Sequence, residues 1–163
     1  MTSGDGLGRV LAIDLGTKRI GIALSDPTAT IATPLETITP AGGRRAAERV
    51  ADLCRRHDVA AVVVGWPRNM DGSRGPAARQ AEAFAGRLRN AVAVPVELWD
   101  ERLSTAAAER ALIEADVRRA ERRRSRDRVA AAVILQGYLD ARRAAAGGDG
   151  LSENESGHNE ARP

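Results

Sequence analysis

The sequence predicts an α/β fold, in which a mixed sheet of about five strands is flanked by helices. Two observations predict this class. Short apolar runs alternate with stretches of helical periodicity from residue 43 onward, which is typical of right-handed parallel crossovers. Two apolar runs near the start are joined by a short glycine-containing turn, which indicates a hairpin and makes the first three strands antiparallel. The chain has 163 residues, enough for one domain with its own core.

Five strands are predicted from the apolar patterns. Residues 10–15 form a nearly continuous apolar run, as expected of a strand that is covered on both faces. Pro34 should confine the third strand to an edge of the sheet or restrict where the strand starts, because proline cannot donate to the ladder. The AAVVVG run at 60–65 indicates a buried parallel strand. The predicted strands span residues 10–15, 19–25, 31–39, 60–65 and 92–99.

Apolar residues at helical spacing predict four helices. Pro76 suits the first turn of the second helix. Ser104 or Thr105 should cap the third, a role that fits these hydroxyls better than that of a nucleophile, since no His lies nearby in the sequence. The predicted helices span residues 43–57, 75–90, 104 or 105 to about 114, and about 125–143.

Composition and charge restrict the environment and the partners. The lone Cys54 excludes an internal disulfide and a cysteine-based zinc site, and it suits a reducing, cytoplasmic location. No apolar run is long enough to span a membrane. Residues 1–8 form a polar leader and residues 147–163 an acidic tail, both expected to be disordered around a domain at 9–146. The chain up to residue 146 carries a net charge of +6, which favours a polyanionic partner.

Carboxylates stand at the ends of three predicted elements. Asp14 ends the first strand, and Asp100 and Glu101 follow the last one directly. In parallel α/β sheets the carboxyl ends of strands share one edge. Asp127 should lie near the start of the final helix, on the face that carries Ala131 and other apolar residues. Taken singly, Asp14 could cap its own turn and Asp127 could be an ordinary first-turn acid.

Taken together, the carboxylates indicate a metal site. Several acids converging on one edge repel each other unless cations lie between them, and oxygen ligands suit Mg²⁺ or Mn²⁺. Two such ions can activate a water and stabilise the leaving oxygen of a phosphodiester. Basic surroundings would then hold a nucleic-acid backbone.

Four blocks of the sequence resemble the YqgF family, also called RuvX, whose members have an RNase H-like fold. They cover much of residues 9–142 and read AIDLGTKRIGIALSD at 12–26, VVVGWPRNMDGS at 62–73, DERLST at 100–105 and RDRVAAAVILQGYLD at 126–140. The resemblance implies a metal-dependent carboxylate triad of Asp14, Glu101 and Asp127. Asp100 is the rival of Glu101 as the ligand from its block, and we prefer Glu101 because its side chain reaches further.

Polar and basic residues around these blocks are candidate contacts to nucleic acid. A solvated turn is the alternative for Lys18 and Arg19, and Asp71 with the following glycine could be only a turn signal. The arginines between 118 and 126 suggest a flexible basic clamp, with a solvated charge run as the alternative. The candidate contacts are Lys18, Arg19, Asn69, Ser73, Arg102, Arg122, Arg123 and Arg124.

The leading hypothesis is a metal-dependent endonuclease that acts on structured nucleic acid. The resemblance favours processing of the 5′ end of pre-16S rRNA, with ribosomal particles as further partners, over resolution of Holliday junctions. A non-catalytic RNA-binding factor in ribosome assembly is the second hypothesis. A sugar kinase or actin-like ATPase is the third, although the chain has room for only one of the two lobes of such enzymes. The residues make no prediction about oligomeric state.

Overall fold

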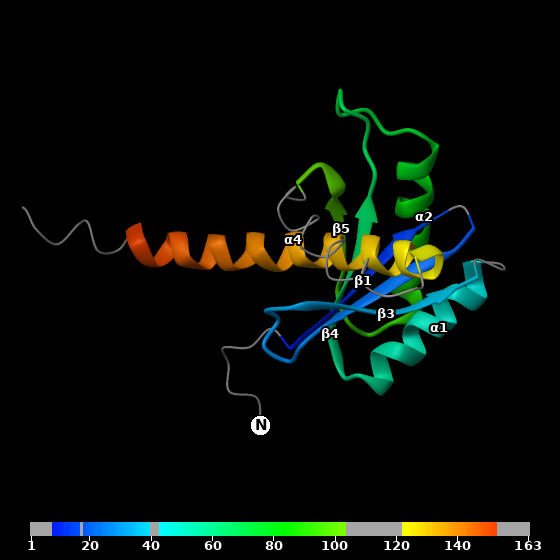
Figure 1. Cartoon of the computed structure of the whole chain (residues 1–163), viewed down its shortest axis with the longest axis horizontal. Coiled ribbons are helices and arrows are strands. Elements are labelled where there is room, and N and C mark those ends of the chain that lie inside the picture. The colour runs from blue at the N-terminus through cyan, green and yellow to red at the C-terminus, as the bar shows by residue number, and fades with distance from the viewer. Residues whose placement is uncertain (1–7, 17, 40–42, 104–121, 153–163) are drawn as a thin grey trace, which may run out of the picture.

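The computed structural model describes residues 8–16, 18–39, 43–103 and 122–152, and these form a five-stranded sheet with helices on both faces (Figure 1). The order of the strands across the sheet is β3-β2-β1-β4-β5. The strands are β1 (Arg9–Leu15), β2 (Ile20–Ser25), β3 (Ala32–Ile38), β4 (Val59–Trp66) and β5 (Val96–Asp100). The helices are α1 (Gly43–Arg56), α2 (Pro76–Ala91), the short 3₁₀ helix η1 (Glu101–Leu103) and α4 (Arg122–Ser152).

The strand directions confirm the predicted mixed sheet. β1 pairs antiparallel with β2, and β2 pairs antiparallel with β3. β4 pairs parallel with both β1 and β5, so the carboxyl ends of these three strands lie at one edge. β3 is an edge strand, as the position of Pro34 predicts, since a proline there removes no hydrogen bond from a second neighbour.

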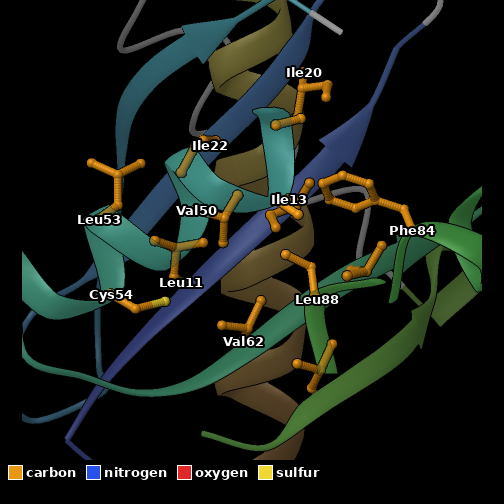
Figure 2. Close-up of a cluster of buried hydrophobic side chains, with 14 of the residues drawn as sticks. Leu11, Ile13, Ile20, Ile22, Val50, Leu53, Cys54, Val62, Phe84 and Leu88 are labelled. Carbon is orange, nitrogen blue, oxygen red and sulfur yellow. The ribbon is translucent and has the colours of Figure 1, made fainter. Parts of the chain in front are cut away.

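Each face of the sheet packs on its own apolar cluster. On one face, Leu11 and Val62 of the sheet pack against Val50 of α1 and Leu88 of α2 (Figure 2). On the other face, Val10 and Val63 belong to the cluster that α4 completes, and the residues of α4 in it are Ala131, Ala132, Ile134, Leu135, Tyr138 and Leu139. Residues next to each other in a strand therefore face different helices, as strand geometry requires.

β5 is shorter than predicted. The sequence pattern predicts a strand over 92–99, but Val92 caps the end of α2 and β5 begins at Val96. Pro95 directly precedes the strand and contributes only its carbonyl oxygen, which accepts a hydrogen bond from the amide of Val62 at 2.9 Å. Asp100 is the last residue of β5 and does not follow it, and η1 begins at Glu101.

α4 is longer than predicted at both ends. The sequence pattern predicts a helix over about 125–143, but α4 begins at Arg122 and ends at Ser152. Residues 122–126 are helical, which corrects the expectation of a flexible basic segment there, and residues 147–152 extend the helix into the predicted disordered tail. The helix continues through Gly147, Gly148 and Gly150, although each glycine costs about 1 kcal/mol relative to alanine. The predicted third helix lies outside the described residues. Among the helices that the structure describes, none is both long and apolar enough to cross a bilayer.

Candidate active site

Strand alternation brings Asp14 and Glu101 to the same face of the sheet. Asp14 continues the register of Val10 and Ala12 on β1, and both of these pack in the cluster under α4. Glu101 directly follows β5, where Trp99 packs against the same cluster. The two carboxylates thus lie at the carboxyl ends of β1 and β5, on the side that α4 covers, and β4 runs between these two strands.

Gly65 of β4 makes room for the Glu101 side chain. Gly65 pairs with Trp99 in the sheet, and its missing side chain would point to the α4 face. A Cβ atom built on Gly65 would lie 2.7 Å from Oε1 of Glu101 and 2.7 Å from Cδ1 of Ile134. A side chain at position 65 would therefore force the Glu101 carboxylate and the end of the Ile134 side chain to shift.

Glu101 is an electrostatically unusual carboxyl. Burial raises its pKa to about 7, and the negative charges of Asp14 and Asp100 add to the effect. Asp14 raises the pKa of Glu101 because its negative charge lies close to the Glu101 carboxyl. A divalent cation between the two would remove this repulsion, and carboxylate oxygens are the ligands that Mg²⁺ and Mn²⁺ prefer. Within the described residues, no three His, Cys, Asp or Glu side chains cluster closely enough to hold a metal ion, so the pair fits a cation but makes only part of a site.

Asp100 points to the opposite face and is held by two arginines. Arg102 donates from Nε to both carboxylate oxygens at 3.1 Å and from Nη2 to Oδ2 at 2.7 Å. Nη1 of Arg68 lies 3.6 Å from Oδ2. These arginines hold the pKa of Asp100 below its usual value, although its partial burial opposes them. Asp100 is thus neutralised by side chains, in contrast to Glu101.

The backbone of α4 carries the third predicted carboxylate. Asp127 lies one helical turn before Ala131 and two turns before Ile134, both of which are buried against the sheet. This position continues the stripe of α4 that faces Glu101 and Gly65. The side chains of residues 122–128 lie outside the description, so the candidate contacts at Arg122, Arg123 and Arg124 are located only as helix positions.

The turn between β1 and β2 presents the first pair of candidate nucleic-acid contacts. Lys18 and Arg19 are exposed beside the end of β1, two strands away from Glu101. The amide of Gly16 donates to the carbonyl of Arg19 at 2.9 Å, and a Cβ on Gly16 would lie 2.5 Å from that oxygen. Glycine at 16 is therefore required to close the turn in this shape.

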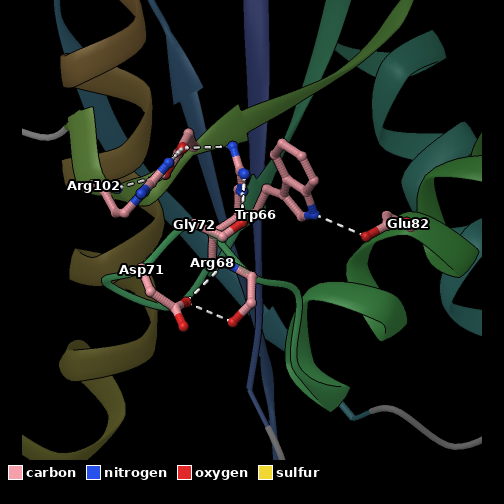
Figure 3. A network of polar contacts seen from close by, with 8 residues as sticks. Trp66, Arg68, Asp71, Gly72, Glu82 and Arg102 are labelled. Atoms are coloured by element: carbon pink, nitrogen blue, oxygen red, sulfur yellow. Dashed lines mark hydrogen bonds and ion pairs between the residues drawn. The ribbon is translucent and has the colours of Figure 1, made fainter.

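Internal hydrogen bonds hold the loop after β4, residues 67–75. Asn69 donates from its amide nitrogen to the carbonyl of Ser73 at 2.9 Å, and its Nδ2 donates to Oγ of Ser73 at the same distance. Oδ1 of Asp71 accepts from the Ser73 amide at 2.9 Å and from its hydroxyl at 2.6 Å, so Asp71 forms a turn, which was one of its two interpretations from the sequence. Asn69 and Ser73 are exposed but bond to each other, and Figure 3 shows how the loop is tied to the sheet.

Two residues of the site were missed by sequence reasoning, namely Gly65 and Arg68. The signal for Gly65 was its position at the end of a buried strand, which often marks a close approach of another group. Arg68 follows a proline in a loop, and nothing local in the sequence distinguishes it from the other arginines. Both become visible only when β5 is placed beside β4.

Comparisons with known proteins show the family of the chain. The family described as "RuvX: Holliday junction resolvase" matches residues 8–141. A protein of Pelotomaculum thermopropionicum named "Putative pre-16S rRNA nuclease" is 52% identical over 133 residues, which cover 81% of this chain and 86% of that protein. A protein of Geobacillus thermodenitrificans with the same name is 51% identical over 83% of this chain and 99% of its own length.

Solved structures share the fold at low sequence identity. Thermus thermophilus RuvC in complex with a Holliday junction substrate superposes with a TM-score of 0.58 at 21% identity, covering 83% of this chain and 95% of that one. The fowlpox virus Holliday junction resolvase gives a TM-score of 0.52 at 14% identity, covering 82% and 99%. The predicted RNase H-like arrangement of the sheet and helices is thereby confirmed.

Proposed function

The chain belongs to the RuvX Holliday junction resolvase family, and from this premise we propose that Asp14, Glu101 and Asp127 form its metal-dependent nuclease site. The chain is a nuclease, a hydrolase of phosphodiester bonds that acts on nucleic acid with divalent metal ions. The observation that carries the proposed site is the pairing of Asp14 with Glu101 beneath α4, where Gly65 leaves room for the Glu101 carboxylate and burial raises its pKa to about 7.

The chemistry of the site follows from its charges. We propose that Asp14, Glu101 and Asp127 would hold two Mg²⁺ or Mn²⁺ ions. When bound, such ions lower the pKa of a coordinated water and neutralise charge on the scissile phosphate. The protein's own part is to fix the carboxylates from rigid elements, two at strand ends and one on a helix. Lys18 and Arg19 are proposed to contact backbone phosphates beside the site, where they are exposed.

The substrate we propose is the 5′ end of pre-16S rRNA, with ribosomal particles as the setting. Relatives that share about half of their residues with this chain carry the name of a pre-16S rRNA nuclease. Four-way DNA junctions are the second candidate, because the family description names that activity. The same carboxylates serve either backbone, since phosphodiester hydrolysis is directed at the phosphate and not at the sugar or the base.

The experiment compares the wild-type protein with Asp14→Asn on precursor 16S rRNA and on four-way junction DNA, each with Mg²⁺ and with Mn²⁺. We expect the wild type to cleave precursor rRNA at its 5′ end and the variant to lose at least a hundredfold in kcat, because a neutral amide holds a divalent cation poorly. Junction cleavage without rRNA cleavage would make the DNA junction the substrate.

Asp58→Asn is the matched control. Asp58 is exposed in the turn before β4 with a φ of 53°, a conformation that asparagine also adopts readily, and it should leave cleavage unchanged. Equal cleavage by Asp14→Asn and the wild type would remove Asp14 from the site. RNA binding by the wild type with no turnover under any metal would instead support a non-catalytic assembly factor.

A further inference from the structure

Arg68 is the point where three separate segments meet. Its guanidinium lies over the Trp66 ring, 4.8 Å from the centroid, at the end of β4. Its Nε donates to the carbonyl of Gly72 at 3.1 Å, within the 67–75 loop, and Nη2 donates to the same oxygen. Its Nη1 pairs with Asp100 at the end of β5 (Figure 3). Because the guanidinium is planar and rigid, these contacts fix the three segments relative to one another.

Asp100 transmits this restraint to Glu101. The Asp100 side chain is only 14% exposed, and its Oδ1 also accepts from the backbone amide of Arg102 at 3.0 Å. The backbone on both sides of Glu101 is thereby anchored on one face of β5, while the Glu101 side chain passes to the other face beneath Gly65. The direction of the Glu101 carboxylate thus depends on the position of Asp100.

Each nitrogen of the Arg68 guanidinium faces a partner inside the protein, which argues against contact to phosphate as its main role. Nε and Nη2 bond to Gly72, Nη1 faces Asp100, and one side of the guanidinium covers Trp66. The Arg68 side chain is 28% exposed, compared with 53% for Arg74 on the same loop. A phosphate ligand would have to compete with these contacts for the same nitrogens.

We propose that Arg68 is a positioning residue that couples the 67–75 loop to Glu101 through Asp100, so that the loop's placement sets the geometry of the metal site. This inference rests on the proposed role of Glu101 as a metal ligand. Loss of the Arg68 contacts would remove none of the proposed ligands but would shift the Glu101 carboxylate. Displacements of about 1 Å are enough to weaken metal binding and catalysis.

The experiment measures Mn²⁺ affinity by calorimetry, together with kcat and KM, for the wild type, Arg68→Met, Arg68→Lys and Arg74→Met. Arg74→Met is the matched control, because Arg74 lies on the same loop and pairs instead with Glu82 of α2 at 2.7 Å. We expect Arg68→Met to bind Mn²⁺ at least fivefold more weakly and to lose kcat with KM within about twofold. Arg68→Lys should recover part of the affinity, and Arg74→Met should bind Mn²⁺ as the wild type does.

Other results would contradict the coupling. A lower melting temperature in Arg68→Met with wild-type Mn²⁺ affinity would make Arg68 a structural tether only, and a raised KM with unchanged kcat would make it a substrate contact. If Arg68→Met does not fold, Asp100→Asn cuts the same link from the other side and should weaken Mn²⁺ binding to a similar degree. A wild type that neither binds Mn²⁺ nor cleaves nucleic acid would overturn the proposed function itself.

Discussion

The carboxylate of Glu101 fills the space that a side chain at Gly65 would otherwise occupy. The two residues belong to neighbouring parallel strands or their ends, and a Cβ on Gly65 would lie 2.7 Å from Oε1 of Glu101. Ile134 of α4 closes the same space from above, at 2.7 Å from that Cβ position. The position of this carboxylate therefore depends on the lack of a side chain at Gly65. The strand that carries Gly65, β4, contributes no carboxylate of its own to the site.

Gly65→Ala should damage the site more than the fold. The added methyl group forces Glu101 and Ile134 to move, which we expect to cost about 1–3 kcal/mol in the free energy of unfolding. The shift of Glu101 should reduce Mn²⁺ affinity and kcat by about tenfold or more, because the ligand leaves its productive position. Denaturant unfolding, calorimetry with Mn²⁺ and cleavage assays measure these three effects.

Gly86→Ala is the control for that substitution. A Cβ on Gly86 meets nothing within 4 Å, and the residue lies inside α2. This variant should gain about 0.5–1 kcal/mol of stability, since alanine favours a helix more than glycine does, and should keep its activity. Wild-type Mn²⁺ affinity in Gly65→Ala would show that Glu101 does not need the space beside β4.

The raised pKa of Glu101 makes the metal-free protein sensitive to pH. Its pKa is about 7 in the folded chain against an ordinary value of 4.5, so the folded state favours the protonated form. Stability from this group is complete below about pH 4.5 and is lost as the pH rises through 7. Because Glu101 is only partly buried, we expect the loss to be about 1–2 kcal/mol at pH 8.

Glu101→Gln should therefore stabilise the metal-free protein at pH 8 and leave it nearly unchanged at pH 4.5. Mn²⁺ should raise the melting temperature of the wild type at pH 8 and have a much smaller effect on this variant. Thermal melts across pH 4–8, with EDTA and with Mn²⁺, measure both effects. Glu48→Gln, an exposed residue of α1 paired with Arg44 at 3.5 Å, is the control and should show neither effect.

The sheet and its order of elements could be predicted because they depend on local patterns. The apolar run of β1, the AAVVVG run of β4 and the edge position of Pro34 each carry their signal in a few adjacent residues. The ends of α4 could not be predicted in the same way. The glycines at 147, 148 and 150 disfavour a helix, so the local pattern predicts an earlier end than the one that α4 has.

Part of the candidate site could also be predicted. The end-of-strand position of Asp14 and the block that contains Glu101 are visible in the sequence, but the separation of Asp100 from Glu101 depends on which residue ends β5. Arg68 and Asp100 are 32 positions apart in the sequence, and no local pattern encodes contacts over such a separation. Pairing across the sheet creates them.

Asp26 should stabilise the turn between β2 and β3 only when it is ionised. Its carboxylate accepts hydrogen bonds from the amides of Ile31 at 2.8 Å and Thr30 at 2.7 Å, and from the Thr28 hydroxyl. These bonds hold its pKa well below the usual 3.8, so the stability they supply is present above about pH 3.8 and is lost as the pH falls below it. Asp26→Asn should lower the melting temperature at pH 7 and have a smaller effect at pH 2.5. An equal loss at both pH values would assign the effect to shape and not to charge.

Gln136 should fix α4 in place over the sheet. Its Oε1 accepts from the amide of Ala32 at 2.9 Å, and its Nε2 donates to the carbonyl of Thr30 and to Asp140, both at 3.0 Å. These bonds tie the helix to the start of β3, on the side of the sheet away from β5. Gln136→Leu should cost about 1–3 kcal/mol of stability, because a partly buried backbone amide and carbonyl lose their partner.

The same substitution tests whether α4 carries a metal ligand. If Asp127 binds the metal, looser placement of α4 should weaken Mn²⁺ affinity in Gln136→Leu beyond what the loss of stability explains, at temperatures where the variant is fully folded. Arg143→Gln removes only an exposed ion pair with Asp140 at 3.0 Å and should leave both stability and Mn²⁺ affinity unchanged. Wild-type Mn²⁺ affinity in folded Gln136→Leu would mean that metal binding does not depend on the hydrogen bonds of Gln136. The third ligand would then lie either outside α4 or in a part of α4 that its apolar contacts alone hold in place. A second measurement with Asp127→Asn separates these two alternatives, because only a ligand on α4 predicts that this variant loses Mn²⁺ affinity.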